Sequence, residues 1–423
     1  MIHFLLMCLP EVMFNMIRID DDKILEGKNA VKNELLEALD GLNYSNIIKK
    51  INSNPNTLKD SIADLASLEL DDLFSKDQYN FGIYFSLCEW MAFNSYRFKT
   101  DTNGKSKFVF TKKYIGEEAD RKRVYRSFKK FIGDFPQVLG LFFEDTIIFP
   151  SQDKDVYFDK TTFDDFFKKA FEVFLKDTIE IKSLVKYSNH RDKFRKKIID
   201  EWAISYCPYC NISPIIEYDN HEKSTAELDH FLSQVDFPMF ALSYGNFIVS
   251  CSNCNQKFKN AKYSRLLNIR QQGFDPCVYF SQTRISYKSY YNYENNEVEI
   301  KIENKCVDPE KRMQIENSID SFKLKDCYER NKEAKREVCD VYRSIKNSYD
   351  NFYLGMIREI KNVEETKIYE ALTDFIIENP TSLELKYRQF DPGYKDKAEI
   401  INISFGKLRK DTLTNILRGS KAT

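Results

Sequence analysis

Two cysteine pairs place the strongest constraint on how this chain folds. The first reads Cys207-Pro-Tyr-Cys210 and the second reads Cys251-Ser-Asn-Cys254, about 40 residues further along the sequence. A C-x-x-C pair can direct two thiolates at one tetrahedral ion, and two such pairs supply the four ligands of a closed structural zinc site. We therefore expect Cys207, Cys210, Cys251 and Cys254 to bind one structural Zn²⁺. Two disulfides or four free thiols are the alternatives.

Polar residues that suit phosphodiester hydrolysis lie between and directly after these pairs. Asp229-His230 precedes the second pair, and Asn255 follows it directly. Such hydrolysis needs a base that activates water and a cation that holds charge on the phosphate. Neutral imidazole makes His230 the candidate base, and Asp229 and Asn255 offer the hard oxygens that Mg²⁺ prefers. The ordinary alternatives are a structural histidine and an asparagine that only caps a helix.

Positive charge is concentrated just after this stretch. Between residues 255 and 270 the chain carries five basic residues and no acidic one. The candidates for binding the phosphates of a nucleic acid are Lys257, Lys259, Lys262 and Arg265. A solvated helix face is the alternative. Two other basic runs, at residues 121–130 and 191–197, have a weaker case for phosphate binding.

Residues 207–265 resemble an HNH nuclease of the ββα-metal class, in its zinc-stapled variant. The family pattern is a C-x-x-C pair, a strand ending in Asp-His, an Asn-Leu entering a second strand, and a C-x-x-C-N that opens a helix. Asp229-His230, Asn246-Phe247 and Asn255 match these positions in order and spacing. Ser233-Gln234 replaces the Pro-Lys that often follows Asp-His, and residues 260–263 replace a common Phe-Pro-Leu ending. Both departures lie outside the catalytic positions.

The resemblance implies a role for each matched residue. His230 would be the general base, and Asp229 and Asn255 would hold a catalytic Mg²⁺ or Mn²⁺ that stabilises the leaving oxygen. Asn246 would tie down the loop between the two strands. The implied function is that of a metal-dependent endonuclease acting on nucleic acid, DNA in the first place. A weaker resemblance, at residues 275–276 and 320–330, is to the HNH effectors of Septu-type anti-phage systems, in which an ATPase accompanies the nuclease.

Two other classes of function stay open. The chain could be a zinc-knuckle module that binds nucleic acid or protein without cleaving it. Alternatively, the chain could be a subunit that is active only with a partner, such as an ATPase or a regulatory protein. The net charge of −1, from 64 basic and 65 acidic residues, gives no global signal for nucleic acid. Any DNA-binding surface must therefore be local or shared with a partner.

Composition predicts a mainly helical α+β protein. Glycine and proline break helices, and the 423 residues include only 13 glycines and 11 prolines. A hydrophobic content of 42% supports a real core, and the length allows about two or three domains. We expect a helical region at 1–187, the small ββα-metal HNH module with its zinc knuckles at 188–270, and a β-hairpin followed by helices at 271–423.

Periodicity locates the individual elements. Apolar residues at helical spacing predict helices, and alternation predicts strands. The predicted helices are 29–39, 61–74, 79–98, 117–131, 159–185, 188–205 and further long helices within 309–379. The predicted strands are 106–110 and a hairpin over 284–303.

The remaining features favour a cytoplasmic protein. The six cysteines outside the two pairs have no paired spacing and are expected to be reduced. The N-terminal segment is apolar but short, is interrupted by Pro10 and Glu11 and lacks a basic start, so neither a signal peptide nor a membrane span is expected. The sequence contains no Walker-type phosphate loop, which argues against ATP hydrolysis by this chain.

Overall fold

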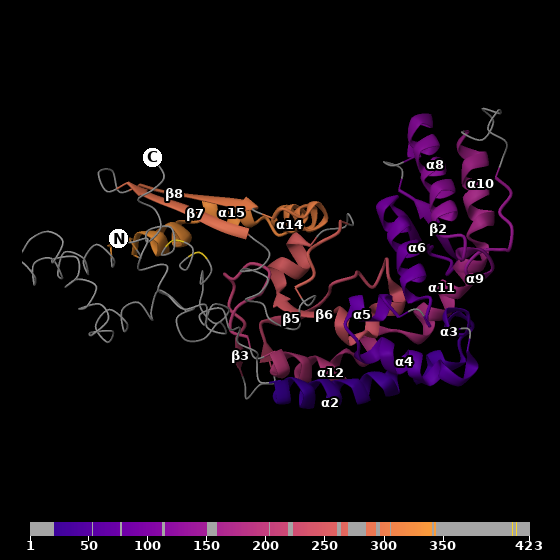
Figure 1. Cartoon of the computed structure of the whole chain (residues 1–423), viewed down its shortest axis with the longest axis horizontal. Helices are drawn as coiled ribbons and strands as arrows, with labels where there is room; N and C mark the ends of the chain where they lie inside the picture. The colour runs from indigo at the N-terminus through magenta and orange to yellow at the C-terminus, as the bar shows by residue number, and fades with distance from the viewer. Residues whose placement is uncertain are drawn as a thin grey trace, which may run out of the picture.

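The computed structural model confirms a mainly helical α+β protein (Figure 1). It describes residues 21–343, apart from 53, 77, 112–114, 150–158, 203, 219–222, 260–263, 270–284, 293–296, 305 and 341, together with Leu408 and Thr412. Within these residues the strands form four separate antiparallel pairs. The predicted helices beyond residue 343 lie outside the described part of the chain. Among the described residues, no helix combines the length and apolar composition needed to cross a bilayer.

Helices form the first part of the described chain. They are α2 (Asp21–Leu39), α3 (Asn46–Ile51), α4 (Leu58–Ser67), α5 (Leu70–Phe74) and α6 (Phe81–Phe93), with short 3-10 turns η2 (Asp40–Tyr44) and η3 (Pro55–Thr57). The helix predicted at 29–39 is confirmed, and its apolar stripe of Val31, Leu35 and Leu39 is fully buried. The helix predicted at 61–74 is wrong in one respect, because Leu68 is extended and separates α4 from α5.

A β-ribbon and four helices follow. The ribbon pairs β1 (Tyr96–Thr100) with β2 (Ser106–Phe110), and the helices are α8 (Glu118–Asp134), α9 (Val138–Leu141), α10 (Lys160–Ala170) and α11 (Glu172–Leu184). The strand predicted at 106–110 is confirmed. The helix predicted at 79–98 ends early, because Ser95 adopts a positive φ of 51° and the chain then enters β1. The helix predicted at 159–185 is interrupted at Phe171, whose ring is buried against Phe143 and Phe174.

The stretch with the candidate site begins with α12 (Tyr187–Trp202), which packs along α2 (Figure 1). After the first cysteine pair come β3 (Glu217–Tyr218), β4 (Lys223–Ser224), β5 (Ala226–His230), the 3-10 turns η5 (Pro238–Leu242) and η6 (Tyr244–Asn246), β6 (Phe247–Cys251) and a short π-type helix η7 (Asn253–Phe258). Strands β5 and β6 pair antiparallel, with Ala226 opposite Cys251 and His230 opposite Phe247. The local order is therefore strand, strand, short helix.

The loop between β5 and β6 is packed into the N-terminal helices. A Cβ added to Gly245 would lie 2.5 Å from the Leu68 carbonyl oxygen and 2.9 Å from Glu69 Cα. Only glycine fits this close approach of two backbones. The break between α4 and α5 lies at this contact. Phe240 in the same loop packs edge-on against Phe74, so the loop shares its core with the N-terminal helices.

The C-terminal described part contains the predicted hairpin. Strands β7 (Ile285–Asn292) and β8 (Glu297–Asn304) pair antiparallel and are followed by α14 (Pro309–Ser321), α15 (Leu324–Glu329) and a further helix over 332–340. The hairpin prediction at 284–303 is confirmed for its two strands. The Tyr328 hydroxyl on α15 donates to the Cys210 carbonyl oxygen at 2.6 Å. The C-terminal helices therefore support the first cysteine pair.

Candidate functional site: a four-cysteine cluster beside a polar cavity

The two cysteine pairs meet in one buried cluster. The sulfur atoms of Cys207, Cys210, Cys251 and Cys254 all lie within 4.8 Å of one another. Backbone turns hold the first pair, since the Asn211 amide donates to the Cys207 carbonyl at 2.7 Å and Asn211 adopts a positive φ of 52°. This set of four thiol ligands could hold a metal ion, and its composition is the one that structural zinc prefers.

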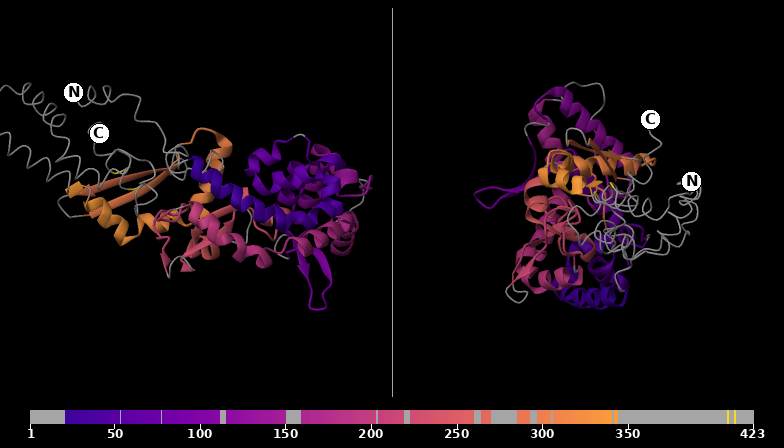
Figure 2. Two further views of the ribbon diagram at one scale, coloured as in Figure 1. Left: turned by 90° about the horizontal axis from the view of Figure 1, so that it is seen from below. Right: turned by 90° about the vertical axis from the view of Figure 1, so that its left-hand side faces the viewer.

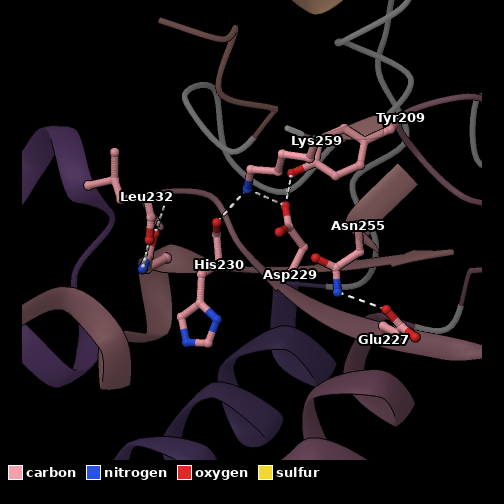
Figure 3. Close-up of polar contacts among 8 residues, drawn as sticks. Tyr209, Glu227, Asp229, His230, Leu232, Asn255 and Lys259 are labelled. Carbon is pink, nitrogen blue, oxygen red and sulfur yellow. Dashed lines mark hydrogen bonds and ion pairs between the residues drawn. The ribbon is translucent and has the colours of Figure 1, made fainter. Parts of the chain in front are cut away.

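Strand β5 presents Asp229 and His230 at its end. Successive side chains on a strand point to opposite faces, and Figure 3 shows the Asp229 carboxylate on one side of the strand and the imidazole on the other. His230 is the last residue of β5. Both residues still line the same cavity, because it extends around this strand end.

Asp229 is held by two donors. Its Oδ2 accepts a hydrogen bond from the Tyr209 hydroxyl at 2.6 Å and lies 2.6 Å from Lys259 Nζ (Figure 3). The same ammonium donates to the backbone carbonyl of His230. Burial lowers the pKa of Lys259 and is opposed by the neighbouring Asp229 charge. Lys259, predicted as a phosphate ligand, thus forms an internal ion pair with the site carboxylate.

His230 is buried and neutral at physiological pH. Burial lowers its pKa to about 4, although the hydrogen bond to the Ala241 carbonyl works in the opposite direction. Nε2 lies 2.9 Å from that carbonyl oxygen. Because a carbonyl can only accept, the proton must be on Nε2 and the lone pair on Nδ1. The Tyr187 ring meets the imidazole edge-on at 4.4 Å between centroids and holds its plane.

Asn246 makes three hydrogen bonds across the loop that joins β5 to β6. Its Oδ1 accepts from the Leu232 amide at 2.6 Å, and its Nδ2 donates to the carbonyls of Leu232 at 3.0 Å and Phe240 at 2.8 Å. The side chain is completely buried and does not line the cavity. Asn246 therefore acts on the shape of the loop and has no direct access to a ligand in the cavity.

Asn255 lies on η7 and is oriented by Glu227. Its Nδ2 donates to Glu227 Oε2 at 2.9 Å, which turns its amide oxygen toward Asp229 (Figure 3). Gln256 donates to the other oxygen of the same carboxylate. Sequence reasoning gave Glu227 no definite role. The available signal was its position two residues before Asp229, which places both side chains on one face of β5.

The cavity has a volume of about 560 Å³ and brings together most of the predicted site residues. Asp229, His230, Asn255 and Lys259 line it. Three arginines that were not assigned to the site line it as well, namely Arg97 from β1 and Arg191 and Arg195 from α12. Arg195 donates to the Ala226 carbonyl at 2.5 Å, whereas Arg191 is exposed. The weakly favoured run at 191–197 thus reaches the site.

The other predicted phosphate ligands lie elsewhere. Lys257 is exposed on η7, next to the cavity residues Asn255 and Gln256. Arg265 forms a bidentate ion pair with buried Glu89, in which Nε lies 2.7 Å from Oε1 and Nη2 lies 2.5 Å from Oε2. That contact ties residue 265 to α6. Lys262 lies outside the described residues.

The hard oxygens near Asp229 fit a weakly held Mg²⁺ or Mn²⁺. Asp229 Oδ1 and the Asn255 amide oxygen are both hard donors, and Mg²⁺ usually keeps several waters and uses few protein ligands. In the described part of the chain, the cysteine cluster is the only group of three or more histidine, cysteine, aspartate or glutamate ligands close enough to share an ion. A cation at Asp229 would also have to displace or accommodate the Lys259 ammonium.

Searches with family models, among curated proteins and among solved structures found no match to this chain.

Proposed function

We propose that this protein is a metal-dependent HNH-type endonuclease that hydrolyses phosphodiester bonds in nucleic acid. The observation that carries the proposal is the neutral His230, whose Nε2 is fixed by Ala241 and whose Nδ1 has no polar partner within the described residues. A buried imidazole held in this way is a base in the correct tautomer, on a cavity that also contains Asp229 and Asn255. The strand, strand, short-helix order supports a ββα-metal module.

Each site residue then has a distinct task. His230 Nδ1 takes a proton from the attacking water, while Ala241 and Tyr187 keep the ring in place. Asp229 and Asn255 would hold the catalytic Mg²⁺ or Mn²⁺, which supplies charge stabilisation at the leaving oxygen. Glu227 orients the Asn255 amide. Arg191, exposed on the rim, is suited to a phosphate oxygen of the substrate.

Zinc has a structural role in this proposal. Four thiolates close the coordination shell and leave no position for a substrate. The second pair joins β6 to η7, so an ion at the cluster would fix the start of the helix that bears Asn255. The first pair contributes Tyr209, whose hydroxyl holds Asp229. The cluster therefore positions groups on both sides of the site.

A binding module without cleavage is the second candidate. The Lys259 ammonium already balances the Asp229 charge at 2.6 Å. Such a pair reduces the attraction of the carboxylate for a cation. In this alternative, the arginines of the cavity bind a phosphate and no bond is broken.

A cleavage assay with a matched histidine control separates these candidates. Plasmid, single-stranded DNA and RNA are incubated with Mg²⁺ or Mn²⁺ and with the parental protein, His230→Ala or His190→Ala. General base catalysis raises a reaction rate roughly 10²–10⁴-fold, so the cleavage rate of His230→Ala should fall at least about 100-fold. His190 lies on α12 outside the residues that line the cavity, and its variant should retain the parental rate. Cleavage at the parental rate by His230→Ala would refute the assignment.

A further inference from the structure

The β1–β2 ribbon stands out from the body of the protein, and its first strand contributes Arg97 to the lining of the cavity. Figure 2 shows it projecting in two perpendicular views. Between residues 96 and 110 the chain carries four basic residues and one acidic residue. This local excess contrasts with the net charge of −1 for the whole chain. The ribbon is therefore a candidate for the local basic surface that a nucleic-acid partner requires.

The basic residues gather on one face. Alternation along the strands places Arg97, Lys99 and Lys107 on the outer face. The aromatic residues point the other way, where Phe108 stacks on Phe174 of α11 with centroids 5.8 Å apart. Lys182 lies over the Phe98 ring at 4.9 Å from its centroid. The inner face thus packs on the protein, and on the outer face Lys99 and Lys107 are exposed whereas Arg97 is half-buried.

Two lysines on this outer face repel each other. Lys99 and Lys107 are direct cross-strand partners, and both are exposed. Like charges directly opposite each other destabilise a strand pair. Neither has an ion-pair partner within the described residues. Lys105 adds a further exposed charge at the tip. A polyanion lying against this face would relieve the repulsion.

The tip is held in one conformation. The Asp101 carboxylate accepts from the amides of Asn103 and Lys105, each at 2.9 Å. The Asp101 amide donates to the Lys105 carbonyl at 3.0 Å, and Gly104 adopts a positive φ of 77°. Pre-organisation of this kind lowers the entropy lost on binding. Asp101, the single acidic residue of the ribbon, therefore stabilises the turn.

The base of the ribbon borders the candidate site. Arg97 lines the same cavity as His230, and its Nε lies 3.4 Å from Asp236 Oδ1 in the loop after β5. A nucleic acid with one phosphate in the cavity would therefore continue along the basic face of the ribbon.

We propose that the substrate is double-stranded DNA and that the β1–β2 ribbon enters its major groove. This inference rests on the proposed function. The major groove of B-DNA is about 12 Å wide and admits a two-stranded β-ribbon, whereas the deep, narrow major groove of A-form RNA does not. Beyond Phe98 and Phe108, which pack on the body of the protein, two residues per strand at about 3.4 Å each and the turn over residues 101–105 extend outward. Only this outer part of the ribbon can reach into the groove, whose depth is about 8.5 Å.

Binding is measured by fluorescence anisotropy on His230→Ala protein without divalent ions. The double variant Lys99→Gln and Lys107→Gln is compared with Lys168→Gln and Lys169→Gln, an exposed pair on α10 outside the cavity. Each phosphate contact contributes about 0.9 to the salt slope. The ribbon variant should bind duplex DNA roughly 10-fold more weakly, with a slope smaller by about 2, and the α10 variant should be unchanged.

A duplex whose major groove carries glucosylated hydroxymethylcytosine should bind weakly to the protein with an intact ribbon. Equal affinity for the plain and glucosylated duplexes overturns the inference. A ribbon variant that keeps its DNA affinity but forms dimers also overturns the inference. In that case the lysines serve only to prevent the strand edges of two molecules from pairing. A parental protein that cuts single-stranded DNA or RNA but not duplex DNA keeps the nuclease activity and overturns the ribbon inference. A protein that cuts nothing overturns the proposed function, while the binding data still test the ribbon.

Discussion

Replacement of His230 by glutamine tests the buried neutral imidazole without any catalytic assay. The glutamine amide can donate to the Ala241 carbonyl from nearly the position of Nε2, but it does not titrate. The ordinary pKa of histidine is 6.5, and burial lowers that of His230 to about 4. The folded protein therefore binds fewer protons at this residue than the unfolded chain does.

The sign and size of the effect follow from this difference. The contribution of His230 to stability is fully present above the unfolded pKa of 6.5 and is lost as the pH falls through the folded value of about 4. Linkage gives a loss of about 2 kcal/mol in the free energy of unfolding between pH 8 and pH 5.

Urea unfolding of both proteins at the two pH values measures this loss. The parental protein should lose about 2 kcal/mol more on acidification than His230→Gln does. Protonation of the cysteine ligands affects both proteins equally, so the difference between them isolates His230. Equal losses in the two proteins would show that the imidazole is not held neutral by burial, and the argument for its role as base would fail.

Three further changes test the surrounding structure. Freshly purified protein should contain about one zinc per chain by elemental analysis, Cys254→Ser should contain far less, and EDTA should stop cleavage before it removes this zinc. Gly245→Ala should lower the free energy of unfolding by roughly 1–3 kcal/mol, whereas Gly133→Ala, where an added Cβ meets nothing within 4 Å, should not. Asn246→Ala should lower the free energy of unfolding, measured by chemical denaturation, by about 3 kcal/mol, because buried backbone groups lose their hydrogen-bond partner. Asn253 is exposed, and Asn253→Ala should change that free energy little.

Features set by local spacing could be predicted from the sequence. The C-x-x-C pairs implied one cluster, and the four sulfurs lie within 4.8 Å of one another. Alternation identified the strand at 106–110 and the hairpin near 284–303. Apolar periodicity located α2 and most other helices, although it missed the breaks at Leu68 and Phe171. Both breaks depend on contacts with distant parts of the chain.

Contacts between residues far apart in the sequence could not be predicted. Arg265 pairs with Glu89, which is 176 positions away, and Arg97 reaches the site from β1. Lys259 was expected to face a phosphate, but it directly follows the end of η7 and its ammonium bonds Asp229 on β5 instead. A charge pattern along one helix says only which residues are basic. Which acid each residue meets is decided by the tertiary packing.

The close contact of Gly245 with the backbone of Leu68 and Glu69 has a consequence for protein engineering. Small functional modules are often excised and fused to a new targeting domain. Here the loop that shapes the site has its counterpart surface on α4 and α5, and the aromatic core is continuous through Phe240. A fragment of residues 188–270 would expose that surface to water. Any transplant of this site must therefore carry the N-terminal helices with it.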